Sequence, residues 1–280
     1  MRLLRYRHAE GFRPGLLDAA GTIRDLSGHV PDIGGDVLSP AGLARVAALD
    51  PATLSAVPEA ALGPPIAGIG KIIGVGLNYR DHAAETGLAL PKEPTLFLKA
   101  TSALAGPADP TPMPRGAKAM DWEVELGVVI GDAAAYVPIE TAMDHVAGYV
   151  LGIDFSERDF QFNRGGQGFK GKSADGFAPL GPWLVTSDAV PDAGDLRLRL
   201  WVNGTLRQDG TTRELIFPVS ELVSYISGFM SLQPGDVILT GTPAGVGLGM
   251  KPPAYLAAGD EVVAEINGLG RQAHRIVAGA

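Results

Sequence analysis

Residues 121–130 read DWEVELGVVI, a run in which acidic and apolar side chains alternate. A period of two is typical of a β-strand, whose successive side chains point to opposite faces. The pattern places Asp121, Glu123 and Glu125 on one face. Three carboxylates on one face repel each other, and a bound divalent cation that prefers hard oxygen ligands, Mg²⁺ or Mn²⁺, would relieve that repulsion. The alternative interpretation is an edge strand with a solvated acidic face.

Two features favour the metal site over the solvated face. The strand continues into the apolar residues 128–130, so it is expected to enter the interior of the protein. A further carboxylate, Asp154, lies within the apolar stretch VLGIDF at residues 150–155. A carboxylate in such surroundings needs a partner or a metal. The partner could instead be Arg158, in a buried ion pair with Asp154.

The composition argues against several classes of protein. The formal net charge of the 280 residues is -8 and no Lys/Arg run stands out, so a nucleic-acid partner is not expected. The absence of cysteine excludes disulfides, thiolate nucleophiles and cysteine-ligated metals. No apolar run approaches the roughly 20 residues of a membrane span, and the N-terminal MRLLRYRHAEG lacks the core of a signal peptide. We therefore expect a cytoplasmic protein with no membrane partner.

The chain is predicted to divide into a small leading unit and a larger remainder. The strands expected in the leading unit cover residues 3–6, 15–17 and 22–24. Ser39-Pro40 is typical of a helix start, and that helix is expected to run to about Leu49. Residues 58–70 are rich in proline and glycine, which is typical of a linker. We predict a small N-terminal α+β domain over residues 1–65 and a metal-dependent catalytic domain over residues 66–280.

From residue 71 onward the predicted strands outnumber the helices. The segment 196–202 alternates cleanly and is followed by Asn203-Gly204, two residues that tolerate the positive φ of a tight hairpin turn. Further strands are expected at 236–240 and 261–266, and helical spacing of apolar residues predicts one amphipathic helix over 219–230. The regular strand–helix alternation of doubly wound folds is missing. We therefore predict a mainly β fold with a few helices packed on the outside.

Two polar segments supply candidate ligand-binding residues. Arg158 and Gln161 are three residues apart, so they share one face of a helical turn. A guanidinium binds a carboxylate in bidentate fashion, and Lys172 offers a point charge for an enolate or oxo oxygen. The stretch LTGTPAGVG at residues 239–247 predicts a strand that ends in a glycine-rich turn, which can aim backbone N–H groups and the Thr242 hydroxyl at a carboxylate. Taken singly, each charged residue is also compatible with an ordinary surface position.

His82 is the histidine with a chemical partner close by in the sequence. It lies in a short predicted helical turn that ends at Gly87, and Glu85 follows it at i+3. A glutamate that orients and polarises a histidine forms a water-activating pair. An ordinary polar pair on a surface helix is the alternative. Neither GxSxG nor HExxH occurs in the chain, which argues against a serine hydrolase and a zinc protease.

Together these segments resemble the fumarylacetoacetate hydrolase superfamily from about Lys71 to Gly270. The motifs that carry the resemblance are, in family order, GVGxNYxxHxxE, DxExELxVVIG, GYxxxxDxSxRDxQ, GKxxDxFxPLGPW and TGTPxGVG. The resemblance implies a mixed β-roll catalytic domain of this type, usually in a homodimer. One departure is Ile153, because family members often have Asn just before the metal-binding Asp.

The resemblance also implies roles for individual residues. Glu123, Glu125 and Asp154 fall on the ligand positions for Mg²⁺ or Mn²⁺, and Asp121 is expected just behind them. His82 and Glu85 fall on the water-activating pair. The residues expected to hold the carboxylate and oxo groups of a small 2-oxo acid are Arg158, Gln161, Lys172, Gly241 and Thr242. Lys172 is also expected to stabilise the enolate product.

The leading unit resembles that of a bacterial subgroup labelled 2,4-diketo-3-deoxy-L-rhamnonate hydrolase or ureidoglycolate lyase. The first label matches the retro-Claisen chemistry of the superfamily, so we expect hydrolysis of a 2,4-dioxo acid to pyruvate, with L-lactate as the second product. A ureidoglycolate lyase, an oxaloacetate decarboxylase and a dioxo-acid isomerase are alternatives on the same site. A non-catalytic small-acid binding protein is a further alternative, which the pairing of His82 with Glu85 disfavours.

Overall fold

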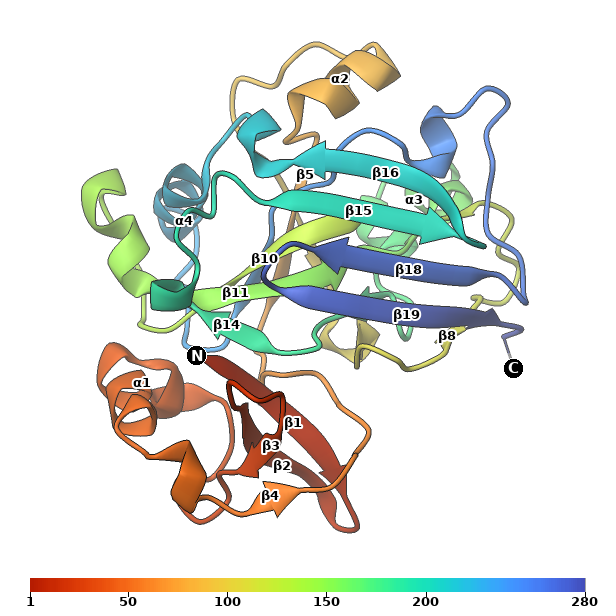
Figure 1. Ribbon diagram of the computed structural model, residues 1–280. Coiled ribbons are helices and arrows are strands. Elements are labelled where there is room, and N and C mark those ends of the chain that lie inside the picture. The colour runs from red at the N-terminus through yellow and green to blue at the C-terminus, as the bar shows by residue number, and fades with distance from the viewer. Residues whose placement is uncertain (280) are drawn as a thin grey trace.

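Two β-sheets form most of the computed structural model, which describes residues 1–279 (Figure 1). The larger sheet has, in spatial order, the strands β4 (Ala56–Val57), β3 (Ile23–Asp25), β2 (Gly11–Leu17), β1 (Arg2–His8), β14 (Leu184–Thr186), β11 (Val146–Ile153), β10 (Val124–Ile130), β17 (Val237–Leu239), β5 (Ile72–Gly76) and β6 (Thr95–Lys99). The second sheet has the order β16 (Thr205–Thr211), β15 (Arg197–Val202), β18 (Glu261–Ile266), β19 (Gly270–Val277) and β8 (Thr111–Pro112). The predicted mainly β fold is confirmed, and the sheets are mixed, since β17 pairs in parallel with β5.

Short elements connect and cover the two sheets. The remaining strand pairs are β12 (Ser156–Glu157) with β9 (Met120–Asp121), and β13 (Ala178–Pro179) with β7 (Leu104–Ala105). The α-helices of the described residues are α1 (Pro40–Ala47), α2 (Arg80–Thr86), α3 (Arg158–Asn163) and α4 (Val219–Ser227). The 3-10 turns are Gly35–Leu38, Pro51–Thr53, Thr101–Ala103, Ile139–His145, Gly168–Gly171, Ser187–Ala189, Thr212–Glu214 and Gly247–Gly249. In the part of the chain that the structure covers, no helix is both long and apolar enough to cross a bilayer.

The N-terminal strands extend the larger sheet. In Figure 1 β1 to β4 and α1 form the red and orange unit at the bottom of the molecule. Strand β1 pairs with β2 along its whole length and also pairs antiparallel with β14, with Leu3 opposite Leu184. Helix α1 begins as the sequence predicts, because the Ser39 side chain accepts a hydrogen bond from the Gly42 N–H and proline follows at the first helical position. The domain boundary near residue 65 stays a prediction.

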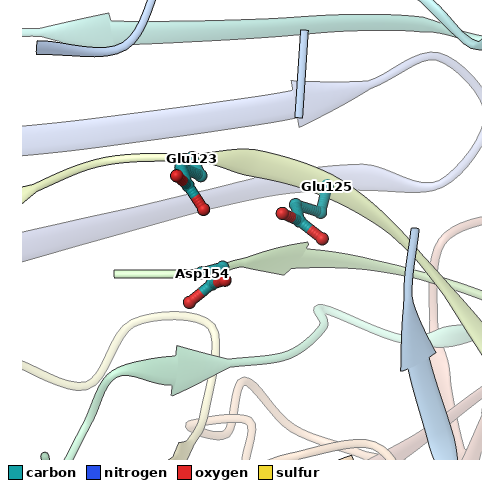
Figure 2. Close-up of side chains that lie close together, drawn as sticks. All are labelled: Glu123, Glu125 and Asp154. Carbon is teal, nitrogen blue, oxygen red and sulfur yellow. The ribbon is translucent and has the colours of Figure 1, made fainter. Parts of the chain in front are cut away.

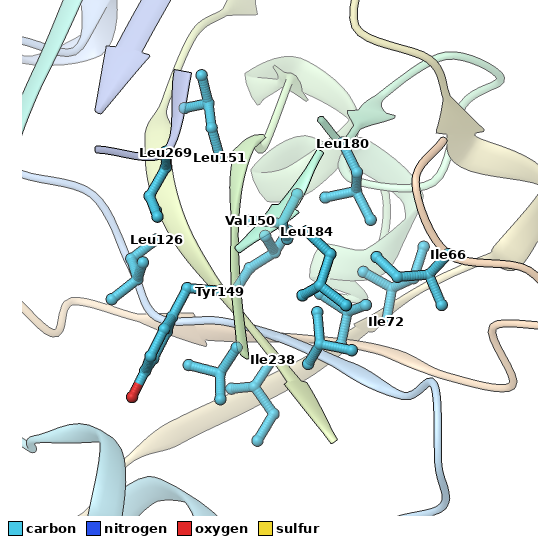
Figure 3. Packing of buried hydrophobic residues seen from close by; sticks show 14 of the residues in the cluster. Ile66, Ile72, Leu126, Tyr149, Val150, Leu151, Leu180, Leu184, Ile238 and Leu269 are labelled. Carbon is cyan, nitrogen blue, oxygen red and sulfur yellow. The ribbon is translucent and has the colours of Figure 1, made fainter. Parts of the chain in front are cut away.

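Strands β10 and β11 lie at the centre of the hydrophobic core. Every residue of both strands is buried, which suits their Val- and Ile-rich sequences. Figure 3 shows Leu126 and Val150 of these strands packed among apolar side chains from neighbouring strands. The two strands pair antiparallel, with Val124 opposite Ile153. The start of β10 and the end of β11 therefore lie side by side, deep in the protein.

The prediction of one continuous strand over residues 121–130 is wrong at its N-terminal end. Asp121 belongs to the separate strand β9, and β10 begins only at Val124. The backbone between them is held by polar side chains and by one backbone bond, from the Asp154 N–H to the Glu123 carbonyl at 2.9 Å. The N–H of Trp122 donates to the Asp121 carboxylate at 2.8 Å, and the N–H of Val124 donates to the side-chain oxygen of Gln208 at 2.9 Å.

The remaining predicted elements occur with small shifts at their ends. Strands β15 and β16 form the predicted hairpin, and Asn203 and Gly204 have φ angles of 50° and 74° at its turn. Helix α4 is shorter than predicted and ends at Ser227, with Leu222, Val223 and Ile226 buried. The predicted strands at 236–240 and 261–266 correspond to β17 and β18.

Candidate active site

Three buried carboxylates meet where β10 begins and β11 ends. Glu123 immediately precedes β10, Glu125 is its second residue, and Asp154 immediately follows β11. One carboxylate oxygen from each residue lies within 4.8 Å of those of the other two. Figure 2 shows the three side chains converging between the two strands. The antiparallel register of β10 and β11 therefore explains why residues about thirty positions apart form one cluster.

Arg158 and Lys172 supply positive charge to this cluster. The Arg158 guanidinium, at the start of α3, donates from Nε to Asp121 Oδ2 at 2.9 Å and from Nη2 to Glu123 Oε1 at 2.6 Å. Lys172 Nζ donates to Glu123 Oε2 and to Asp154 Oδ2, each at 2.7 Å. These carboxylates raise the pKa of Lys172 despite its burial. The Asp154–Arg158 ion pair considered as an alternative does not form, because Arg158 binds Asp121 and Glu123 instead.

Lys99 is a member of the cluster that we did not predict from the sequence. It is the last residue of β6, its side chain is buried, and its Nζ donates to Asp154 Oδ1 and, at 3.3 Å, to the carbonyl oxygen of Phe155. Burial lowers the pKa of Lys99, while Asp154 opposes that shift. The available signal was a lysine that ends the apolar run TLFLK of residues 95–99. A lysine at such a position must find a buried partner.

The buried charges of the cluster do not balance. Four carboxylates face three cations; the acidic residues are Asp121, Glu123, Glu125 and Asp154, and the basic residues are Lys99, Arg158 and Lys172. Glu125 lacks a cationic hydrogen-bond partner, and its Oε2 accepts from the N–H of Gly241 at 2.8 Å. Burial and the neighbouring carboxylates raise the pKa of Glu125 well above its ordinary value. An added divalent cation would supply the missing positive charge, and oxygen ligands suit Mg²⁺ or Mn²⁺. The residues present therefore fit such an ion.

His82 and Glu85 form the contact that their spacing predicts. His82 Nδ1 lies 2.9 Å from Glu85 Oε2 on helix α2. The other Glu85 oxygen accepts a hydrogen bond from the N–H of Gly245 at 2.8 Å, and Asp81 accepts one from the N–H of Ala244 at 3.3 Å. Helix α2 is therefore held against the glycine-rich turn of residues 240–247. Because Nδ1 faces a carboxylate, it carries the proton, which leaves Nε2 as an acceptor.

The glycine-rich turn of residues 240–247 is hydrogen-bonded to the carboxylate cluster and to the start of β10. The Gly241 N–H, which was expected to bind substrate, donates a hydrogen bond to Glu125 instead. It therefore points toward the carboxylate cluster. The Thr242 hydroxyl donates to the Val124 carbonyl at 2.9 Å and accepts from Gln208 Nε2 at 2.7 Å. Gln208 is fully buried, and its side-chain oxygen accepts from the Val124 N–H. Nothing in the local sequence of β16 indicated that Gln208 would reach this site.

The carboxylate cluster and His82 face the same cavity, which has a volume of about 380 Å³. It is lined by Val75, Gly76, Leu77, His82, Thr86, Leu88, Thr95, Leu96, Phe97, Glu123, Glu125, Arg158, Gln161, Phe162, Gly168, Lys172, Thr242 and Leu248. Arg158 Nη1 also donates to Gln161 Oε1 at 3.0 Å, which fixes the two side chains on one wall. Asp154, Glu85 and Gly241 lie behind the wall, each hydrogen-bonded to a lining residue. The volume is at the small end of ligand pockets, so the cavity suits a small metabolite.

Comparison with known proteins assigns the chain to a family. Residues 71–277 match the family described as Fumarylacetoacetate (FAA) hydrolase C-terminal. The chain belongs to this family. One relative in Burkholderia cenocepacia (strain HI2424), whose name gives it as a hydrolase without a substrate, is 55% identical over 277 residues, which are 98% of each chain.

Two solved structures are similar to this fumarylacetoacetate hydrolase family member over their whole length. Maleylpyruvate hydrolase from Sphingobium sp. SYK-6, solved in complex with manganese (II) ion and pyruvate, is 32% identical with a TM-score of 0.82 and covers 100% of both chains. The 5-carboxymethyl-2-hydroxymuconate delta-isomerase from Mycobacterium smegmatis is 32% identical with a TM-score of 0.78, again over 100% of both chains. The family therefore includes enzymes that catalyse different reactions on this fold.

Replacing Lys99 by methionine tests the charge balance of the cluster. Lys99→Met keeps an unbranched apolar chain but leaves Asp154 with Lys172 alone, so we expect the free energy of unfolding to fall by about 3 kcal/mol. Adding Mn²⁺ should recover part of that loss, because the ion supplies positive charge beside Asp154. Urea unfolding with and without Mn²⁺ measures both effects. Lys92→Met, at an exposed lysine, is the control, and equal stability of the two variants would contradict the role of Lys99.

Proposed function

We propose that this chain is a divalent-metal-dependent hydrolase that cleaves the C3–C4 bond of a 2,4-dioxo acid and releases pyruvate. One observation carries the proposal: the same cavity is lined by His82, which Glu85 holds, and by the carboxylates Glu123 and Glu125. A hydrolase needs an activated water beside the groups that bind its substrate. A binding protein has no use for such a pair. The similarity to a maleylpyruvate hydrolase solved with manganese and pyruvate supports the same assignment.

Different residues of the site bind different groups of the substrate head. When bound at Glu123, Glu125 and Asp154, Mg²⁺ or Mn²⁺ supplies Lewis-acid polarisation of the substrate's 2-oxo group. Arg158 and Gln161 lie on the same wall, and the proposed donors to the substrate carboxylate are the Gln161 amide N–H groups and those guanidinium N–H groups that do not bind Asp121, Glu123 or Gln161. Lys172 adds a positive charge for the oxygen that becomes the enolate. Local positive groups thus capture an anion despite the acidic net charge of the chain.

The water-activating step falls to His82. Its Nε2 accepts a proton from water while Glu85 accepts the Nδ1–H hydrogen bond and stabilises the imidazolium. The hydroxide adds to the C4 carbonyl carbon, the C3–C4 bond breaks, and its electron pair remains on C3 as the pyruvate enolate. The proton held on His82 then returns to C3. The net reaction consumes one water and yields pyruvate and a second carboxylic acid.

The substrate that we favour is 2,4-diketo-3-deoxy-L-rhamnonate, cleaved to pyruvate and L-lactate. An isomerase is the second candidate, because the sequence identity to the Mycobacterium smegmatis delta-isomerase equals that to the hydrolase, at 32%. The deciding experiment compares kcat/KM for this substrate, a simple acylpyruvate, oxaloacetate and ureidoglycolate with metal present. Pyruvate release is followed with a coupled dehydrogenase, urea release from ureidoglycolate with a urease assay, and double-bond migration by ultraviolet absorbance. The highest kcat/KM on oxaloacetate or ureidoglycolate, or double-bond migration without cleavage, would refute the hydrolase assignment.

Removing the metal should abolish activity. Dialysis against a chelator is expected to reduce pyruvate release to background, and Mg²⁺ or Mn²⁺ should restore it. Glu123→Gln and Asp154→Asn should each weaken Mn²⁺ binding, measured by calorimetry, because a neutral amide replaces an anionic oxygen ligand. Full activity of a protein shown by elemental analysis to contain no metal would overturn the proposal.

Removing the imidazole should impair turnover more than binding. We expect His82→Ala to lower kcat by roughly 10² to 10⁴-fold if His82 is the general base. Oxalate should still bind the metal-loaded variant, because its contacts do not involve His82. His29→Ala, at an exposed histidine of the N-terminal unit, serves as the control. A His82→Ala variant with near-normal kcat would show that the histidine is only a helix residue.

A further inference from the structure

Charged groups are confined to one end of the cavity. Glu123, Glu125, Arg158 and Lys172 lie at the carboxylate cluster. The rest of the wall is apolar or uncharged, and its larger side chains are Leu77, Leu88, Leu96 and Phe162. Phe97 and Leu248 lie at the cluster itself, because Lys172 Nζ is 5.0 Å from the Phe97 ring centroid and the Leu248 N–H donates to Asp121. Among the described residues that line the cavity, the hydroxyl groups outside the cluster are those of Thr86 and Thr95. A substrate whose head binds at the cluster must therefore place its tail against uncharged surface.

Neither cation of the cavity is free for a tail group. Arg158 is bound to two carboxylates and to Gln161. Lys172 is bound to Glu123 and Asp154. His82 is paired with the Glu85 carboxylate, so even the protonated pair carries no net positive charge. A second carboxylate on the substrate would have no cationic partner in the lining that the structure describes.

Electrostatics then disfavours a charged tail. A carboxylate that gives up part of its hydration against apolar side chains, without gaining a partner, is destabilised. A single hydroxyl is tolerated, since Thr86 donates its proton to the His82 carbonyl at 2.9 Å and keeps its oxygen as an acceptor. Maleylpyruvate and 5-carboxymethyl-2-hydroxymuconate, the compounds after which the two similar enzymes are named, each carry more than one carboxylate. The wall described here suits a substrate with a carboxylate at its head only.

We infer that this cavity selects 2-oxo acids whose tail is short and uncharged, at most singly hydroxylated, and that it rejects tails that end in a carboxylate. The inference rests on the proposed function for the placement of the substrate head. It adds a specificity wall formed by Leu77, Leu88 and Phe162. The tail of the favoured sugar-acid substrate, with one hydroxyl and one methyl group, satisfies this requirement.

Matched 2-oxo acids test the inference without any turnover. The pairs are 2-oxopentanoate with 2-oxoglutarate and 2-oxohexanoate with 2-oxoadipate, in which chain length is equal and only the terminal group differs. Calorimetry with the Mn²⁺-loaded protein should give Kd values at least about tenfold lower for the uncharged member of each pair. Equal or tighter binding of the dicarboxylates overturns the inference.

Turnover separates this inference from the proposed function. An acylpyruvate with an alkyl tail should show a kcat/KM at least about tenfold above that of the equally long acylpyruvate with a terminal carboxylate. If neither compound releases pyruvate while the binding preference persists, the proposed hydrolysis fails and the specificity wall stands. If the carboxylate-tailed compound is cleaved faster, the wall is wrong and the hydrolase assignment stands.

A charge introduced into the wall gives the sharpest test. Leu88 is 58% exposed and lines the cavity, whereas Leu90 is 53% exposed in the same loop and does not. Leu88→Lys should reduce the preference for uncharged tails about tenfold, because it supplies the missing partner. Leu90→Lys, with the same charge and similar exposure, should leave the ratio unchanged. An unchanged ratio in Leu88→Lys, or an equal change in both variants, overturns the placement of the tail.

Discussion

The candidate site depends on the compensation of four buried carboxylates. A buried charge is tolerated only when hydrogen bonds and opposite charges replace its hydration. Three cations and a set of backbone N–H groups provide most of that compensation here. The remaining deficit is the physical reason why a divalent ion would fit there, and burial beside the other carboxylates raises the pKa of Glu125. The surrounding fold can be understood as the means of holding these charges together.

Each supporting element serves the cluster from a different part of the chain. Strands β10 and β11 bring Glu125 and Asp154 close together. The register of the two strands is fixed because all their side chains are buried. Strand β6 contributes Lys99 from the far edge of the same sheet. The second sheet contributes Gln208, which links the backbone of β10 to the Thr242 hydroxyl. The glycine-rich turn then connects the carboxylates to helix α2 through Gly241 and Gly245.

Local patterns in the sequence predicted what depends on short spacing. The His82–Glu85 contact, the Asn203–Gly204 turn and the mainly β composition all follow from residues close together in the chain. The break before β10 could not be predicted, because the group that caps its backbone is the distant Gln208. Lys99 was missed for the same reason: its partner Asp154 is far away in sequence. Family motifs compensated for this limit by grouping distant segments, but they gave no indication of Lys99 or Gln208.

The pairing of β1 with β14 has a consequence for the integrity of the fold. Without the leading strands, β14 would become a sheet edge with unpaired backbone groups, next to the fully buried β11. Exposed edges of this kind recruit strands from other chains and cause aggregation. The N-terminal unit, although it contributes no side chain to the cavity lining, therefore acts as a protective cover against self-association.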